Sequence, residues 1–184
     1  MSPRGELVLV RHAESEIPRP GGPDEYHRPL TATGLAQAAS LVLPRPTRVV
    51  SSPYLRAVQT VAPLGLPVDT VHELREWDSG LQPSPDYARH YAASWADPEM
   101  ARPGGESLAQ LTSRAVAALT ALADGGVVVV GSHGTFVARA LAGFGVSTVD
   151  WPFSAAMPMP AVYRIRFSAG HPHVSGPGLG GDAA

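Results

Sequence analysis

Residues 6–15 read ELVLVRHAES, and this stretch decides the fold class. After Glu6 the chain holds an unbroken run of leucine and valine that ends at Val10. Such a short apolar run with polar neighbours is typical of a strand that is buried on both faces, as in a parallel sheet. No turn-forming residue separates the run from Arg11 and His12. We therefore expect two polar side chains directly at the carboxyl end of a buried strand.

Further strands and helices alternate along the chain. Valine-rich runs at 47–52 and 125–132 predict two more buried strands, and the alternating segment AVYRIRF at 161–167 favours an edge strand. Helical patterns cover 33–42, 51–62, a long segment from Ser107 and a segment from about Thr135. Ser52 and Ser107 are the expected N-caps of the second and third of these helices, and Gln110 is expected to complete a capping box with Ser107.

This alternation predicts an α/β fold with a mostly parallel sheet and helices on both faces. We expect one domain over residues 1–170, since a chain of 184 residues suits a single core. The polar and aromatic segment around 78–105 is interpreted as a small cap, and the glycine-rich residues 171–184 as a flexible tail.

Composition excludes several classes of function. A net charge of −2 gives no electrostatic case for nucleic acid or a membrane surface as partner. No apolar segment is long enough for a signal peptide or a membrane span, so a cytoplasmic location is the default expectation. The absence of cysteine rules out disulfides, thiolate metal sites and a cysteine nucleophile. The chain also has no lysine, so a phosphate site must use arginine, histidine and backbone N–H groups.

Four short stretches carry the residues suited to chemistry, and each lies at an expected strand end or helix start. They are VRHAES (10–15), SSPYLRAVQT (51–60), ELREWDSG (73–80) and GSHGTF (131–136). Together they supply three arginines, two histidines and carboxylates without metal-ligand spacing. In open α/β sheets the ligand binds beyond the carboxyl ends of the strands. There a neutral imidazole can attack phosphorus, arginine forks can bind phosphoryl oxygens, and a glutamic acid can protonate a leaving oxygen.

The same four stretches resemble, in order, the motifs of the histidine phosphatase superfamily, also called the phosphoglycerate mutase-like fold, a three-layer sandwich. The resemblance spans about residues 6–167 and includes PGGES at 103–107. It implies that His12 is the nucleophile that becomes phosphohistidine, and that Arg11, Arg56 and His133 form the phosphate pocket. Glu76 would be the general acid, because it keeps the family's spacing to Gly80. Glu73 and Asp78 fit that role less well, and Glu14 is expected to be secondary.

Some features depart from the family pattern or leave other activities open. Pro18 stands where many members have an asparagine that touches the phosphate, and HRPLTATG (27–34) resembles small bacterial phosphohistidine phosphatases. We expect a metal-independent phosphomonoester hydrolase that uses no cofactor and acts on a small phosphorylated metabolite. The alternatives are a phosphoglycerate mutase, a protein phosphohistidine phosphatase and a non-catalytic phosphate-binding module. A serine esterase is disfavoured because GSHG lacks the spacing of a nucleophile elbow.

Overall fold

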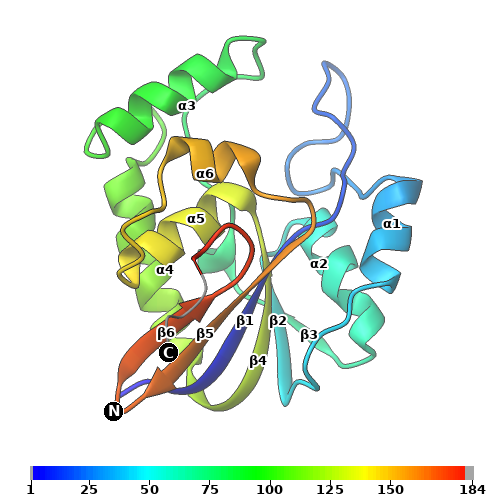
Figure 1. Ribbon diagram of the computed structural model, residues 1–184. Coiled ribbons are helices and arrows are strands. Elements are labelled where there is room, and N and C mark those ends of the chain that lie inside the picture. Colours follow the sequence, from blue (N-terminus) through cyan, green and yellow to red (C-terminus); the bar gives the residue numbers. More distant parts are fainter. Residues whose placement is uncertain (1, 181–184) are drawn as a thin grey trace.

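The computed structural model, which describes residues 2–180, places a six-stranded sheet at the centre of the molecule (Figure 1). The strand order is β3-β2-β4-β1-β5-β6. The strands are β1 (Arg4–Arg11), β2 (Arg48–Ser51), β3 (Val68–Thr70), β4 (Asp124–Ser132), β5 (Ala161–Ser168) and β6 (His171–Ser175). The pairs β1–β4, β2–β4 and β2–β3 are parallel, whereas β5 is antiparallel to both β1 and β6. The predicted α/β class with a mostly parallel sheet is confirmed.

Helices cover both faces of the sheet (Figure 1). The α-helices are α1 (Ala32–Ala39), α2 (Leu55–Val61), α3 (Tyr87–Ala96), α4 (Leu108–Leu122), α5 (Gly134–Gly143) and α6 (Trp151–Ala156), and two short 3-10 helices are η1 (Ala62–Leu64) and η2 (His72–Leu74). Helices α1 and α2 lie on one side, and α4, α5 and α6 lie on the other (Figure 1).

The alternating side chains of β1 enter two different cores. Leu7 and Leu9 belong to the larger core, which includes the apolar faces of α4 and α5. Val8 and Val10 belong to a smaller core on the opposite face, together with Val61 of α2. All four side chains of the run are fully buried. Burial on both faces is the physical reason for the unbroken apolar run in the sequence.

The helix starts agree with the sequence at α4 and differ at α2. Ser107 and Gln110 form the predicted capping box, with both reciprocal hydrogen bonds present. At α2 the prediction of Ser52 as N-cap was wrong, since the helix begins at Leu55 after Tyr54. The Ser52 hydroxyl instead hydrogen-bonds to His133, a partner remote in sequence, and accepts only a long contact of 3.3 Å from the backbone N–H of Tyr54.

The structure also differs from the sequence-based predictions at the last two strands, and it adds a helix within the segment around 78–105. Strand β5 is not an edge strand, because residues 171–175, which we assigned to a flexible tail, form β6 beside it. The end of that predicted tail, residues 181–184, lies outside the described residues. The segment around 78–105 contains helix α3, whose Tyr91 packs against Trp77 at 4.9 Å between ring centroids. Its role as a cap stays a prediction.

Candidate active site

The candidate site lies at the carboxyl edge of the parallel strands. Arg11 of β1 pairs in register with Ser132 of β4, so the next residue of each strand, His12 and His133, leaves the sheet beside the other. The backbone N–H of His12 donates to the Ser132 carbonyl at 3.0 Å. The two imidazole rings meet edge to face with centroids 5.3 Å apart. Parallel register alone therefore brings together two histidines that are far apart in the sequence.

His12 is buried in a defined orientation, with 8% of its surface exposed. Its Nδ1 lies 2.7 Å from the carbonyl oxygen of Ala13. Because a carbonyl only accepts hydrogen bonds, this contact assigns the proton to Nδ1 and leaves the lone pair on Nε2. Burial, and then the positive charge of Arg56, lowers the pKa of His12 to about 3. The ring is therefore neutral at physiological pH, with its electron pair on Nε2, the nitrogen that faces Arg56.

His133 is completely buried and held by one polar contact. A hydrogen bond of 2.8 Å joins its Nε2 to the hydroxyl of Ser52, the residue that follows β2. Burial and the charge of Arg56 lower the pKa of His133 well below its usual value. Its Nδ1 has no hydrogen-bond partner among the described residues. This leaves a second neutral imidazole with one nitrogen unused, next to His12.

Arg56 is a buried guanidinium, with 2% of its surface exposed, on the first turn of α2. Its Nε donates to Nε2 of His12 at 3.3 Å. Its other nitrogens donate to the backbone carbonyl and the carboxylate of Glu25 at 2.7 and 2.9 Å. The guanidinium also lies over the ring of Tyr54, 5.0 Å from the centroid. An anion that reached this guanidinium would lie beside Nε2 of His12, the nitrogen without a proton.

Thr60 joins the two elements that carry His12 and Arg56. Its hydroxyl donates to the carbonyl of Arg56 at 2.7 Å and accepts from the backbone N–H of Ala13 at 3.0 Å. Thr60 is the last residue of the motif SSPYLRAVQT, and it is buried. The motif's threonine thus ties the loop after β1 to helix α2.

Arg11 reaches the site across the start of α5. One terminal nitrogen donates to the backbone carbonyl of Met157 and lies 3.5 Å from that of Pro158. An ideal Cβ placed on Gly134 would lie 3.0 Å from Nε of Arg11. A side chain at position 134 would therefore crowd the guanidinium, which would have to shift by a few tenths of an ångström. Burial lowers the pKa of Arg11 from its usual value, and the negative charge of Glu76 opposes this shift.

Glu76 is bound at the N-terminus of α5, the helix that begins directly after His133. Its Oε1 accepts from the backbone N–H groups of Trp77 and Phe136 at 2.8 and 2.9 Å. Its Oε2 accepts one longer hydrogen bond, 3.2 Å, from the backbone of Thr135. A helix N-terminus attracts a carboxylate through its free N–H groups. Oε2 is thus the oxygen with fewer and longer hydrogen bonds.

The other acids named from the sequence lie in different surroundings. Glu14 accepts from the hydroxyl of Thr31, the N-cap of α1, at 2.7 Å. Glu73 contributes its backbone carbonyl to Arg114 at 2.6 Å. Asp78 accepts a long contact of 3.4 Å from the backbone of Gly80 within its own turn. Of the four acids, only Glu76 binds its carboxylate to the start of α5.

Glu25 and Arg28, from the loop at 16–29, lie near Arg56, and no sequence motif indicated them. The Glu25 carboxylate accepts from Arg28 at 3.0 Å as well as from Arg56 at 2.9 Å. Arg28 is buried and also donates to the hydroxyl of Ser15 at 2.8 Å. Burial raises the pKa of Glu25, but the two arginines outweigh it and hold the pKa below its usual value. A carboxylate therefore occupies part of the arginine cluster.

The described residues hold neither a metal-binding cluster of side chains nor a helix suited to span a membrane. Among residues 2–180, no group of three or more histidine, aspartate or glutamate side chains could hold a metal ion. In the same part of the chain, no helix combines the length and hydropathy that a membrane-spanning segment needs.

Comparison with known proteins places this geometry in a family context. The family model for the histidine phosphatase superfamily (branch 1) matches residues 7–178. A search of curated proteins gives no match.

Several solved structures are similar over nearly the whole chain. A phosphoserine phosphatase variant from Entamoeba histolytica, solved with phosphoserine, is 20% identical, with a TM-score of 0.75 over 94% of this chain and 96% of its own. A mycobacterial glucosyl-3-phosphoglycerate phosphatase is 22% identical, with a TM-score of 0.72 over 94% and 96% of the two chains. The Thermus thermophilus protein TTHB049 is 29% identical, with a TM-score of 0.66 over 87% and 92%. At 20% and 22% identity, the first two structures show that the fold is shared, and no more than that.

Proposed function

The chain belongs to the histidine phosphatase superfamily (branch 1), and on that premise we propose that it hydrolyses phosphate monoesters through a phosphohistidine on His12. One observation carries the proposal: a neutral imidazole with its lone pair on Nε2 lies beside the buried guanidinium of Arg56, 3.3 Å from its Nε. The nucleophile and a phosphate-binding group are thus adjacent in the same buried site. Arg11 and His133 complete the proposed phosphate pocket.

The first step transfers the phosphoryl group to the enzyme. Arg56 Nε turns its hydrogen from His12 to a phosphoryl oxygen, which frees the lone pair of Nε2 for attack. The bond from Nε2 to phosphorus forms as the bond from phosphorus to the ester oxygen breaks. The leaving oxygen takes a proton from Oε2 of Glu76 and departs as an alcohol. Arginine supplies the positive charge at the equatorial oxygens, so this step needs no metal ion.

The second step returns the enzyme to its starting state. Glu76, now a carboxylate, accepts a proton from a water molecule that attacks phosphorus. The bond from phosphorus to Nε2 breaks, which releases inorganic phosphate and neutral His12. The protonated Glu76 is then ready for the next ester.

The substrate we propose is a small phosphorylated metabolite. Two similar structures are named as phosphatases of phosphoserine and of glucosyl-3-phosphoglycerate, both small molecules. The Glu25 carboxylate, bound to the terminal nitrogens of Arg56, would oppose an entering phosphate dianion by charge repulsion, because both anions would lie against the same guanidinium.

Hydrolysis of p-nitrophenyl phosphate in excess chelator tests the proposal. Wild type is expected to turn over, and His12→Ala is expected to lose activity by more than about 1000-fold, as for removal of a nucleophile. Alkaline quench should trap phosphate on the wild type alone, because phosphohistidine is stable in alkali and hydrolyses in acid. Equal turnover in His12→Ala would refute the mechanism, and isomerisation of 3-phosphoglycerate would indicate a mutase instead.

A further inference from the structure

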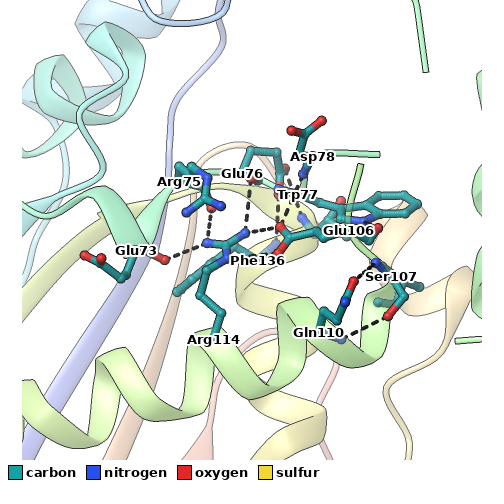
Figure 2. Close-up of polar contacts among 12 residues, drawn as sticks. Glu73, Arg75, Glu76, Trp77, Asp78, Glu106, Ser107, Gln110, Arg114 and Phe136 are labelled. Atoms are coloured by element: carbon teal, nitrogen blue, oxygen red, sulfur yellow. Dashed lines mark hydrogen bonds and ion pairs between the residues drawn. The ribbon is translucent and has the colours of Figure 1, made fainter. Parts of the chain in front are cut away.

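Arg114, on helix α4, binds the backbone of the segment that carries Glu76 (Figure 2). Its guanidinium donates to the carbonyls of Glu73 at 2.6 Å, Arg75 at 3.0 Å and Glu76 at 3.4 Å. Three carbonyls within four residues therefore converge on a single side chain. With two further contacts to Glu106, these bonds use all five N–H donors of the planar guanidinium, whereas an ammonium group has only three.

Glu106 orients the guanidinium of Arg114 and also binds the two residues that follow Glu76 in the chain. Its Oε2 accepts from Nε of Arg114 at 3.2 Å, and its Oε1 pairs with a terminal nitrogen of the same residue. The backbone of Glu106 donates to the carbonyl of Asp78 at 2.8 Å and accepts from the indole N–H of Trp77, also at 2.8 Å. Arg114 thus binds the chain up to residue 76, and Glu106 binds the two residues that follow.

The pair is shielded from water, which gives these contacts weight. The side chains of Arg114 and Glu106 are 12% and 15% exposed. Such a pair is screened less than a surface ion pair. Its place is fixed in turn by the capping box of Ser107 at the start of α4, next to Glu106 (Figure 2).

The segment between η2 and α3 has no ladder or helix of its own to fix it. Residues 75–86 form no helix or strand. Backbone groups in such a segment need other partners, and here Arg114 and Glu106 provide them. Glu76 nevertheless requires a defined position, since its carboxylate must meet both the N-terminus of α5 and a leaving oxygen.

We infer that Arg114, locked by Glu106, is a positioning residue for Glu76: it sets where the proton of the general acid is delivered. The inference rests on the proposed function, because it assumes that Glu76 protonates the leaving group. Arg114 donates only to backbone carbonyls and to Glu106 and is not assigned to the phosphate pocket. Its removal is therefore expected to impair proton delivery more than phosphate binding.

Leaving groups of different basicity separate positioning from a general structural role. Phenolate is a poorer leaving group than p-nitrophenolate and depends more on a proton from the enzyme. Removal of Arg114 should therefore reduce kcat/KM for phenyl phosphate more than for p-nitrophenyl phosphate. A merely loosened fold would lower both by the same factor.

The experiment measures kcat/KM for both esters in wild type, Arg114→Gln and the matched control Arg139→Gln. Arg139 is also a partly buried arginine between α4 and α5, where it donates to the hydroxyl of Thr112 at 2.9 Å, but it makes no hydrogen bond to the segment of Glu76. We expect Arg114→Gln to lose about 10- to 100-fold on phenyl phosphate and less than about 5-fold on p-nitrophenyl phosphate. Inhibition by inorganic phosphate should stay within about 3-fold of wild type, and Arg139→Gln should resemble wild type on both esters.

A second variant and a double mutant complete the test. Glu106→Gln removes the charge that locks Arg114 while keeping its size, and should show the same preference in weaker form. In a Glu76→Gln background, Arg114→Gln should have almost no further effect on phenyl phosphate, because the group it positions is already disabled.

Several results would overturn the inference. They are equal losses on both esters, full additivity with Glu76→Gln, or unfolding of both Arg114→Gln and Glu106→Gln while Arg139→Gln folds. These failures leave wild-type hydrolysis and its loss in His12→Ala intact. A wild type that hydrolyses neither ester would instead refute the proposed function, and this inference with it.

Discussion

Burial of two neutral imidazoles makes the stability of this fold depend steeply on pH. The pKa of His12 is lowered to about 3 and that of His133 well below its usual value, mainly by burial and secondly by Arg56. In the unfolded chain both rings return to an ordinary pKa of about 6.5. Below that pH the unfolded state binds protons that the folded state excludes. Stability contributed by the neutral rings is therefore complete above about pH 6.5 and is lost as the pH falls toward 3.

The size of the loss follows from proton linkage. Each excluded proton costs about 1.4 kcal/mol per pH unit once the pH is well below 6.5. Between pH 7 and pH 5 His12 therefore removes about 2 kcal/mol from the free energy of unfolding, and His133, whose pKa is lowered in the same direction, adds to this loss. Glu6, whose pKa is lowered from 4.5 by Arg164, loses its contribution only at more acid pH. The loss in this window is therefore assigned to the imidazoles.

Urea unfolding at pH 7 and pH 5, at constant ionic strength, measures this loss. His12→Gln should show a decrease smaller than that of wild type by about 2 kcal/mol, because the proton that His12 excludes is no longer bound by the unfolded chain. His171→Gln is the matched control, since His171 is exposed on β6. His171→Gln should show the full wild-type decrease in the free energy of unfolding between pH 7 and pH 5. A wild-type decrease below about 1 kcal/mol, or an undiminished decrease in His12→Gln, would refute the reasoning.

Two further predictions concern contacts around the site and at the start of α4. Glu25→Gln should tighten inhibition by inorganic phosphate about fivefold, because the half-exposed Glu25 carboxylate competes for Arg56. This factor corresponds to about 1 kcal/mol. Inhibition by phosphate that is unchanged or weaker in the variant would show that Glu25 does not compete. Ser107→Ala should lower the free energy of unfolding by about 1 kcal/mol through loss of the capping box, measured by urea unfolding with Ser113→Ala, an exposed position in α4, as control. A wild-type urea midpoint in Ser107→Ala would contradict that estimate.

The fold class was predictable because the parallel strands are buried on both faces. Each of β1 and β4 sits between two helical layers, and this constraint appears in the sequence as runs of leucine and valine. Where one face is less buried the sequence alternates, as in β5. The error at β5 concerned its neighbour, since β6 reads HPHVS and gives no apolar signal. Its proline suits an edge strand, which needs fewer backbone donors.

The positions of His12 and His133 were predictable from the ends of the strands, while the surroundings of the site were not. His12 and His133 follow paired strands, so their proximity follows from topology. Glu25 and Arg114 instead act through contacts between segments far apart in sequence, and no local pattern records such partners. The false N-cap at Ser52 has the same cause, because a tertiary contact with His133 takes the hydroxyl that local sequence assigns to the helix.

One arrangement accounts for both the proposed reactivity and the expected acid sensitivity. A histidine can attack phosphorus only while neutral, and placing it beside arginines in a buried site keeps it neutral far below its ordinary pKa. The same arrangement withholds a proton that the unfolded chain would bind, which destabilises the fold in acid. A variant that exposed His12 to water would lose less stability between pH 7 and pH 5 than wild type, but it would protonate the proposed nucleophile in that range. The acid sensitivity is thus expected from keeping the proposed nucleophile neutral among the arginines of the proposed phosphate pocket.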